Sequence, residues 1–363
     1  MVRASRYLGI LGLFLTRAAA SCSPLTFSIT TEAENVVFGN LPDPKNATAV
    51  KKYFVDSLTQ GPNITGTQHT TGTFRISARF CAPPAGVKPL GTLQLLVNGI
   101  TYNKALWTGF GFPEYDWEAF ATRKGYYTLA IDRIGHGESD KPDPFAVTQG
   151  PTHVSLLHEV IQLVQSGDCG IPVPDKIAYV GHSYGAALGN HLGLAHPDDV
   201  DAYVLMGYSD TINVDVSLLS SLDPAATLFR RFKGVPFGYL TFATEAARTS
   251  VLYGGAFDPA VARRDFEKQD TISVGELFSP GLDRVVTPFD GPVFVITGDV
   301  DFFFCHVEGP DACGEALRET GRKLYPDAKY EYEVVPNAGH LLTTQKSARG
   351  VFKSVHSWLD KVL

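Results

Sequence analysis

Short apolar runs alternate along most of the chain with longer segments in which apolar residues recur at helical spacing. The strand-like runs cover residues 93–97, 126–131, 176–180, 202–206, 292–297 and 330–335, and the helical patterns cover 116–124, 152–165, 186–194 and 347–362. Uninterrupted apolar runs are typical of strands buried on both faces of a parallel sheet. The pattern therefore predicts an α/β fold with a mostly parallel central sheet and helices on its two faces.

Two stretches depart from this alternation. Residues 21–70 form a polar N-terminal leader with one predicted helix near 48–58, and the alternating segment 73–80 behind it predicts a half-exposed antiparallel strand. Residues 209–288 are rich in aromatic side chains but show no strand-like run, which predicts a mostly helical insertion. The core of the fold then comprises residues 71–208 and 289–363, with 209–288 as a cap. Such a cap would enclose an apolar pocket, unless its aromatic residues only fill its own core.

The N-terminus has the plan of a secretory signal peptide, which we assign to residues 1–20. Arg3 and Arg6 precede an apolar run over 7–15, and small residues at 18–20 provide a cleavage site. The run is too short to span a bilayer, so we expect a secreted protein without stable membrane insertion. A retained signal anchor is the alternative.

The composition is that of a globular protein, with 44% hydrophobic and 19% charged residues. The formal net charge is −7, and removal of residues 1–20, which hold three arginines and no acidic residue, makes it −10. An acidic chain without basic clusters argues against nucleic acid as a partner. Asn46 and Asn63 lie in N-x-T sequons and are predicted glycosylation sites. The oligomeric state stays open.

The five cysteines fit an oxidising compartment. Cys305 and Cys313 lie close together in the sequence and are predicted to form a disulfide. Cys22 could pair with Cys81 and leave Cys169 free, or Cys81 could pair with Cys169 instead. The cysteine spacing does not match a zinc site, and no metal or cofactor is predicted.

The candidate chemistry centres on Ser183 in the run Gly-His-Ser-Tyr-Gly over 181–185, which matches G-x-S-x-G. The motif follows the predicted strand 176–180 and precedes the predicted helix 186–194. A sharp strand-to-helix turn presents the serine hydroxyl at a helix N-terminus, where N–H groups favour a developing negative charge. Ser183 is therefore the predicted nucleophile, and His182 is predicted to point away from the chemistry.

A serine nucleophile needs a base, and the base needs a third group that orients it. His340 follows the predicted strand 330–335 in a glycine-containing loop, and Asp299 and Asp301 follow the strand 292–297. We prefer Asp301 because its greater distance from the glycine lets the loop turn toward the histidine. Backbone N–H groups of Ile100, in the loop after strand 93–97, and of Tyr184 are the predicted oxyanion hole.

Residues 131–142 resemble the D-x-R-x-G-x-G-x-S loop of the α/β-hydrolase superfamily. With the serine, acidic and histidine loops in the same order, the resemblance runs from about residue 91 to the C-terminus. It implies the α/β-hydrolase fold with an inserted helical cap, and a mostly structural role for Asp132, Arg133 and His136. The family usually has His-Gly where this chain has Asn98-Gly99. The leader and sequons are similar to those of secreted hydrolases of filamentous fungi, in the esterase and lipase-like branch.

We expect a serine hydrolase that cleaves a carboxylic ester, lactone or related acyl bond of a small apolar substrate through an acyl-enzyme. Epoxide hydrolases and haloalkane dehalogenases, which this chain also resembles, have aspartate at the position of Ser183. The serine at this position disfavours their chemistry. A proline-iminopeptidase-like aminopeptidase is less favoured, because those relatives usually have Trp where this chain has Tyr184. Hydroxynitrile-lyase or acyl-transfer chemistry on the same triad stays open. A catalytically dead binding protein is least favoured, because such proteins tend to lose a triad residue.

Overall fold

The computed structural model describes residues 20–305 and 311–363. Apart from Ala20, the predicted signal peptide lies outside the described residues. In the part of the chain that is described, no helix is both long enough and apolar enough to cross a membrane.

An eight-stranded sheet in the order β1-β2-β4-β3-β5-β6-β10-β11 forms the centre of the molecule. Its parallel strands are β3 (Thr92–Val97), β4 (Tyr127–Ile131), β5 (Lys176–His182), β6 (Ala202–Met206), β10 (Pro292–Gly298) and β11 (Lys329–Val335). The strands at the centre are buried on both faces, as their continuous apolar runs predict. The predicted α/β-hydrolase fold is confirmed.

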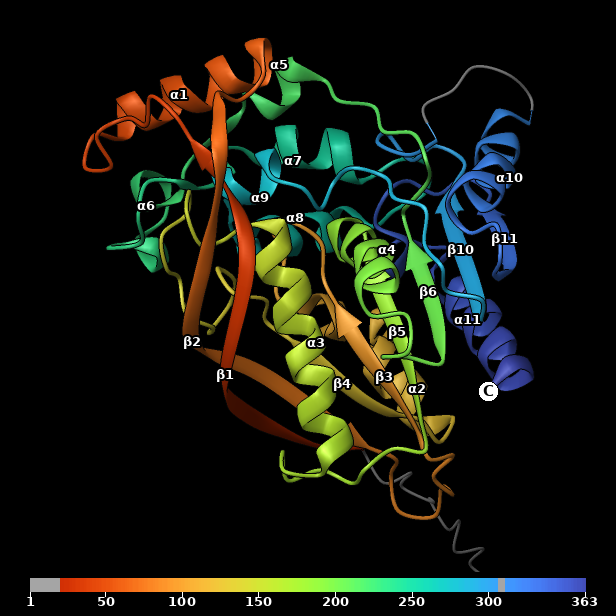
Figure 1. Ribbon diagram of the computed structural model, residues 1–363. Helices are drawn as coiled ribbons and strands as arrows, with labels where there is room; N and C mark the ends of the chain where they lie inside the picture. The colour runs from red at the N-terminus through yellow and green to blue at the C-terminus, as the bar shows by residue number, and fades with distance from the viewer. Residues whose placement is uncertain (1–19, 306–310) are drawn as a thin grey trace, which may run out of the picture.

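Helices cover both faces of the sheet (Figure 1). One face packs against α3 (Gly150–Ser166), α4 (Tyr184–Ala195) and α10 (Ala312–Leu324), and the other against α2 (Trp117–Arg123) and α11 (Ala348–Val362). Neighbouring residues of a strand point to opposite faces, so Leu95 belongs to the apolar core that contains Leu157 of α3, while Leu96 belongs to the core that contains Phe352 of α11. The two apolar cores hold the strand ends in fixed positions.

The segment predicted as a polar leader belongs to the sheet. β1 (Ser21–Phe38) pairs with β2 (Ile64–Ala82) in an antiparallel hairpin that β4 joins to the rest. The boundary expected at residue 70 therefore falls inside β2 and is wrong. An edge hairpin is exposed on one face, so its polar residues concealed its strand character. The helix expected near 48–58 is α1 (Ala47–Gln60), which connects the two strands.

The insertion 209–288 lies over the carboxyl ends of the parallel strands (Figure 1). Its helices are α5 (Val216–Leu219), α6 (Ala225–Leu228), α7 (Glu245–Leu252), α8 (Pro259–Lys268) and α9 (Val274–Phe278). It also contains a small antiparallel sheet of β7 (Leu222–Pro224), β8 (Tyr239–Phe242) and β9 (Ile272–Ser273). The expectation that this segment lacks strands is wrong, because strands of two to four residues are too short to show alternation.

Short 3₁₀ helices complete the described elements: η1 (Lys104–Gly111), η2 (Pro113–Tyr115), η3 (Arg230–Phe232) and η4 (Leu342–Thr344). Disulfides join Cys22 to Cys81, across the β1–β2 hairpin, and Cys305 to Cys313. Cys169 is a free, partly buried cysteine, so the alternative pairing of Cys81 with Cys169 is not formed.

Candidate active site

Ser183 lies at the turn between β5 and α4 with backbone angles φ 56 and ψ −117. These angles are rare for a residue with a side chain, and they point the hydroxyl away from the sheet. The turn is possible because glycines flank it: a Cβ atom at Gly181 would lie 2.5 Å from the Gly185 carbonyl oxygen, and one at Gly185 would lie 2.2 Å from that of Val97. The sequence G-x-S-x-G thus folds into a strained turn whose neighbours leave no room for other side chains.

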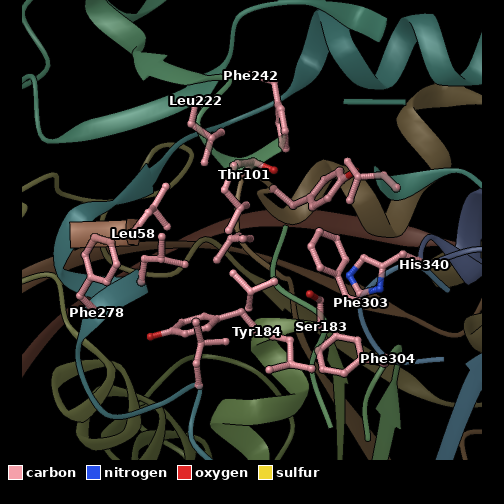
Figure 2. A pocket seen from close by; sticks show the side chains of 18 of the residues that line it. Leu58, Thr101, Ser183, Tyr184, Leu222, Phe242, Phe278, Phe303, Phe304 and His340 are labelled. Carbon is pink, nitrogen blue, oxygen red and sulfur yellow. The ribbon is translucent and has the colours of Figure 1, made fainter. Parts of the chain in front are cut away.

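Asp301 and His340 form a buried pair beside this turn. The Nδ1 atom of His340 lies 2.9 Å from Oδ2 of Asp301, and both side chains are almost inaccessible to solvent. The other carboxylate oxygen of Asp301 accepts hydrogen bonds from the N–H groups of Phe303 (2.9 Å) and Phe304 (3.2 Å). His340 and Ser183 line the same cavity and lie at the same end of it (Figure 2). Asp301 contacts Nδ1 of His340, and in the part of the chain that the structure describes Nε2 of the same ring has no hydrogen-bond partner.

Asp299 has a different environment. Its carboxylate is exposed and accepts a hydrogen bond from the N–H of Ala338 at 3.2 Å. It therefore stabilises the turn before His340, while Asp301 contacts the imidazole itself. His182 also avoids the cavity side, since its Nε2–H donates to the backbone carbonyl of His340 at 3.0 Å. Burial, followed by the neighbouring His340, lowers the pKa of His182 to about 3, so this ring is neutral at ordinary pH.

Ile100 and Tyr184, the predicted oxyanion residues, both line the cavity that contains Ser183. Within residues 20–305 and 311–363, neither of their backbone N–H groups has a hydrogen-bond acceptor. The loop that carries Ile100 approaches the nucleophile closely, because a Cβ atom at Gly99 would lie 2.9 Å from Cβ of Ser183. Both donors are thus free at the position where charge would develop on a substrate oxygen.

Asn98, at the position usually held by histidine, stabilises this loop from inside. Its Nδ2–H₂ group donates to the carbonyl oxygens of Gly99 (3.2 Å) and Tyr102. The guanidinium of Arg133 donates to the carbonyl oxygens of Asn98 (3.0 Å) and Gly99 (3.1 Å). Because the carbonyl of Gly99 and the N–H of Ile100 belong to one planar peptide unit, these bonds fix the orientation of the Ile100 N–H. Arg133 therefore supports the candidate oxyanion loop and does not reach the substrate position.

A buried carboxylate from the cap neutralises Arg133. Glu276 of α9 accepts hydrogen bonds from Arg133, from His136 at 2.8 Å and from His153 at 3.0 Å. Burial alone would raise the pKa of Glu276, but the electrostatic attraction of His136 and Arg133 and the hydrogen bonds of His136 and His153 outweigh it and hold the pKa well below its usual value. Burial, with the adjacent Arg133, lowers the pKa of His153 to about 4. Asp132 accepts from the backbone N–H groups of Lys104 and Glu138, so this residue also has a structural environment.

Among the residues that the structure describes, two groups of side chains have the composition of metal ligands, but neither is suited to hold an ion. In the group His136, His153 and Glu276, the carboxylate already binds the guanidinium of Arg133, whose charge opposes a cation. In the second group, the rings of His158 and His196 are stacked at 3.7 Å with an interplanar angle of 12°. Lone pairs of parallel stacked rings do not converge on one ion.

The cap also contacts the loops of the candidate site directly. The backbone N–H of Thr101 donates to the carbonyl of Thr271 at 3.0 Å, and the N–H of Asp270 donates to the carbonyl of Thr101 at 2.8 Å. The guanidinium of Arg248, paired with Asp265 at 2.8 Å, donates to Oγ1 of Thr101 at 2.8 Å. Segments more than a hundred residues apart in the chain thus fix one loop.

A cavity of about 420 Å³ opens in front of Ser183, between the sheet and the cap. Phe303 and Phe304 lie next to His340 at one end, with ring centroids 5.0 and 5.6 Å from its ring. Apolar side chains from β7, β8, α9 and α1 surround the rest, including Leu222, Phe242 and Phe278 (Figure 2). Part of the aromatic content of the cap therefore lines the cavity.

The model of the alpha/beta hydrolase family matches residues 94–352 of this chain. The chain belongs to this family. Its β3 to α11 segment carries the serine, acidic and histidine loops within the matched residues, so this α/β-hydrolase has the three side chains in the order that the resemblance implies.

The relatives are distant. A segment of 100 residues, or 26% of this chain, is 35% identical to Epoxide hydrolase 3 of Siraitia grosvenorii and spans 29% of that protein. A monoglyceride lipase variant from Saccharomyces cerevisiae superposes with a TM-score of 0.55 at 16% identity, over 79% of this chain and 92% of the other. An esterase from Thermogutta terrifontis gives 0.51 at 16%, over 80% and 95%. At such identities the structural likeness shows the fold alone.

Several residues of this site give little signal in the sequence. Arg248 and Leu58 lie in segments without a recognisable motif, and the contacts of Arg248 with Thr101 and of Glu276 with Arg133 join residues that are distant in the chain. The capping box of α9, in which Ser273 and Glu276 bond to each other's backbone N–H groups, was the one local pattern that could have marked Glu276. The side chains of Asn46 and Asn63 are exposed at the two ends of α1, and their glycosylation stays a prediction.

Proposed function

We propose that this α/β-hydrolase is a serine hydrolase that cleaves a carboxylic ester, lactone or related acyl bond of a small apolar substrate. The observation that carries the proposal is the 2.9 Å contact between His340 Nδ1 and Asp301, in the same cavity as Ser183 on its strained turn. An oriented imidazole beside a serine hydroxyl that faces a cavity is the arrangement that activates serine as a nucleophile.

The reaction follows from the positions of these groups. Ser183 Oγ attacks the acyl carbon while Nε2 of His340 accepts its proton, and Asp301 stabilises the imidazolium through Nδ1–H. The N–H groups of Ile100 and Tyr184 hold the negative oxygen of the tetrahedral intermediate. The intermediate collapses, and His340 gives its proton to the leaving alcohol. Water activated by His340 then attacks the acyl-enzyme and releases the acid.

Ser183 and the cavity lining support this proposal over two of the alternatives. Epoxide opening by direct displacement at carbon uses a carboxylate nucleophile, and this chain has a serine there, although part of it resembles an epoxide hydrolase. Most of the lining is apolar, and the carboxylate of Asp283, which also lines the cavity, is already paired with His191 at 3.0 Å, so the cavity favours an apolar acyl or alcohol group over the charged amino terminus that an aminopeptidase must bind. We further propose that the protein is secreted, in keeping with the apolar N-terminal segment, the two disulfides and the exposed sequons.

Covalent labelling by a short-chain fluorophosphonate tests the proposal, since only an activated serine reacts. We expect labelling of the wild type, none in Ser183→Ala, and strongly reduced labelling in His340→Ala. Ser279→Ala is the matched control, because Ser279 lines the same cavity but its hydroxyl accepts a hydrogen bond from the N–H of Gly150. Wild-type protein that stays unlabelled while folded, or labelling that survives in Ser183→Ala, would overturn the proposal.

A further inference from the structure

Helix α1 lies outside the segment that matches the family, yet it forms part of the cavity wall. It connects the two strands of the N-terminal hairpin and lies above the sheet next to α5 of the cap (Figure 1). The family match begins at residue 94, after both strands of that hairpin. The cavity of this chain is therefore completed by an element that the shared core does not supply.

Polar contacts fix α1 to the cap. The Nζ atom of Lys51 donates to the carbonyl oxygens of Ser220, at 2.7 Å, and Leu222, and pairs with the carboxylate of Asp223 at 2.9 Å. Lys51 Nζ thus uses its donors on one short stretch that includes β7. Because Leu222 itself lines the cavity, this contact sets the position of α1 relative to the cavity wall.

An apolar contact fixes the same helix further along. Phe54 is fully buried, and its ring lies 6.0 Å from that of Phe278 at the end of α9. Phe278 itself lines the cavity. One helical turn beyond Phe54, Leu58 reaches the cavity, and Pro62 follows after the helix ends at Gly61. Helix α1 therefore buries Phe54 in the cavity wall and presents Leu58, one turn later, to the cavity.

The close view places Leu58 beside Phe278, at the opposite end of the cavity from His340 and Ser183 (Figure 2). Leu58 and Phe278 at that end, and Leu222 and Phe242 along the adjoining wall, are apolar, and the hydroxyl of Thr101 on the same wall already accepts a hydrogen bond from Arg248 at 2.8 Å. A charged or hydroxyl-rich group would lose its hydration there without gaining hydrogen bonds. An apolar chain extending from the acyl carbon would instead fill the space and contact α1 last.

We propose that α1 is a specificity element, and that Leu58 limits the length of the apolar chain that the cavity accepts. The proposal rests on the proposed function for its assay, and it names the substrate class more closely as esters with an extended apolar group. The N-terminal hairpin thus contributes selectivity, while the catalytic groups come from the shared core.

Hydrolysis of a series of p-nitrophenyl esters, from acetate through butyrate and octanoate to dodecanoate, measures the length limit. We expect Leu58→Trp to lower kcat/KM for the longest esters that the wild type cleaves by at least about tenfold and to leave acetate within about twofold. Leu58→Ala should shift the preference toward longer chains. Val55→Ala is the matched control, since Val55 packs against the same apolar cluster from α1 without lining the cavity. Equal effects along the whole series, or none, would overturn the proposal.

Binding to a protein that cannot turn over separates this inference from the proposed function. In a Ser183→Ala background, we expect a dansyl-labelled long-chain fatty acid to bind, and Leu58→Trp to weaken its Kd by at least about tenfold. If wild-type protein resists fluorophosphonate and cleaves no ester, the serine hydrolase fails while this measurement still decides the role of α1. Absence of binding, or a Kd that is the same in the Leu58 variants, would overturn the role of α1 alone.

Discussion

Asp301 and Asp299 lie two positions apart on the loop after β10, yet their carboxylates differ in burial and in hydrogen-bond partners. Asp301 is buried and divides its two oxygens between the imidazole of His340 and the N–H groups of Phe303 and Phe304. Backbone donors thus fix the position of Asp301, which suits it to orient His340 as the proposed base. Asp299 is exposed, and its carboxylate accepts a hydrogen bond from the backbone of the next loop. Because its carboxylate is held by two backbone N–H groups, Asp301 is better suited than Asp299 to keep the imidazole of His340 in one orientation.

We therefore expect Asp301→Asn to lower kcat for ester hydrolysis by about ten-thousandfold, because the amide can donate toward Nδ1 and favours the wrong tautomer of His340. Asp299→Asn keeps the size and the acceptor oxygen and should change kcat by less than about threefold. Steady-state kinetics on both variants, with circular dichroism to confirm folding, makes the comparison. A large loss in Asp299→Asn with little change in Asp301→Asn would assign the orienting role to the other carboxylate.

The cap is hydrogen-bonded to the loop that carries Ile100 and Thr101. Thr101, a β-branched residue, adopts φ 58, a conformation that side chains of its kind avoid. It is kept there by two backbone hydrogen bonds to Asp270 and Thr271 and by the side chain of Arg248. The neighbouring Ile100 carries one of the candidate oxyanion donors. The part of the cap from α7 to α9 therefore positions this loop and is not a freely moving lid.

Removing the Arg248 contact tests this positioning role. Arg248→Met alone would leave Asp265 buried and unpaired, so we combine it with Asp265→Leu to remove both charges. We expect the double variant to stay folded but to show kcat lowered by about tenfold to a hundredfold, with KM nearly unchanged, because a displaced donor weakens only transition-state binding.

Arg264→Met is the matched control, since Arg264 lies in the same cap and pairs at the surface with Glu267. It should keep wild-type kinetics. A double variant that raises KM while keeping kcat would show that Arg248 shapes the substrate cavity and does not position the oxyanion loop.

The sequence predicts those elements whose signal is local. Strand β5, the turn at Ser183 and helix α4 follow one another within twenty residues, so apolar runs and glycines identify them together. The strands of the cap are too short for alternation to appear. The contacts of Arg248 with Thr101 and of Glu276 with Arg133 join residues 147 and 143 positions apart, and no local pattern specifies such pairs. The same holds for Leu58, whose role depends on where the hairpin carries α1.

A buried series of hydrogen bonds joins helix α11 to the central sheet. Trp117 of α2 donates to Oε1 of Gln94 in β3 at 2.8 Å, and Nε2 of Gln94 lies 3.0 Å from Nε2 of His356 in α11. Nδ1–H of His356 donates to the carbonyl of Phe352 at 2.7 Å. Since indole can only donate, the orientation of each group along this series is fixed, and Nε2 of His356 must accept. The arrangement fits the neutral imidazole and excludes the charged one.

Burial lowers the pKa of His356 from 6.5 to about 4. As the pH falls through this interval, the unfolded chain binds a proton at His356 while the folded chain does not, so acidification removes stability. At about pH 5 this one group should cost the wild type about 2 kcal/mol of unfolding free energy relative to about pH 7.5.

His356→Gln keeps a donor and an acceptor without a titrating group. Urea unfolding of both proteins at the two pH values should give a drop in unfolding free energy that is smaller in the variant by this amount. Equal drops in the two proteins would mean that His356 takes up a proton in the folded state as readily as in the unfolded chain, which the hydrogen bonds of Gln94 and Trp117 forbid.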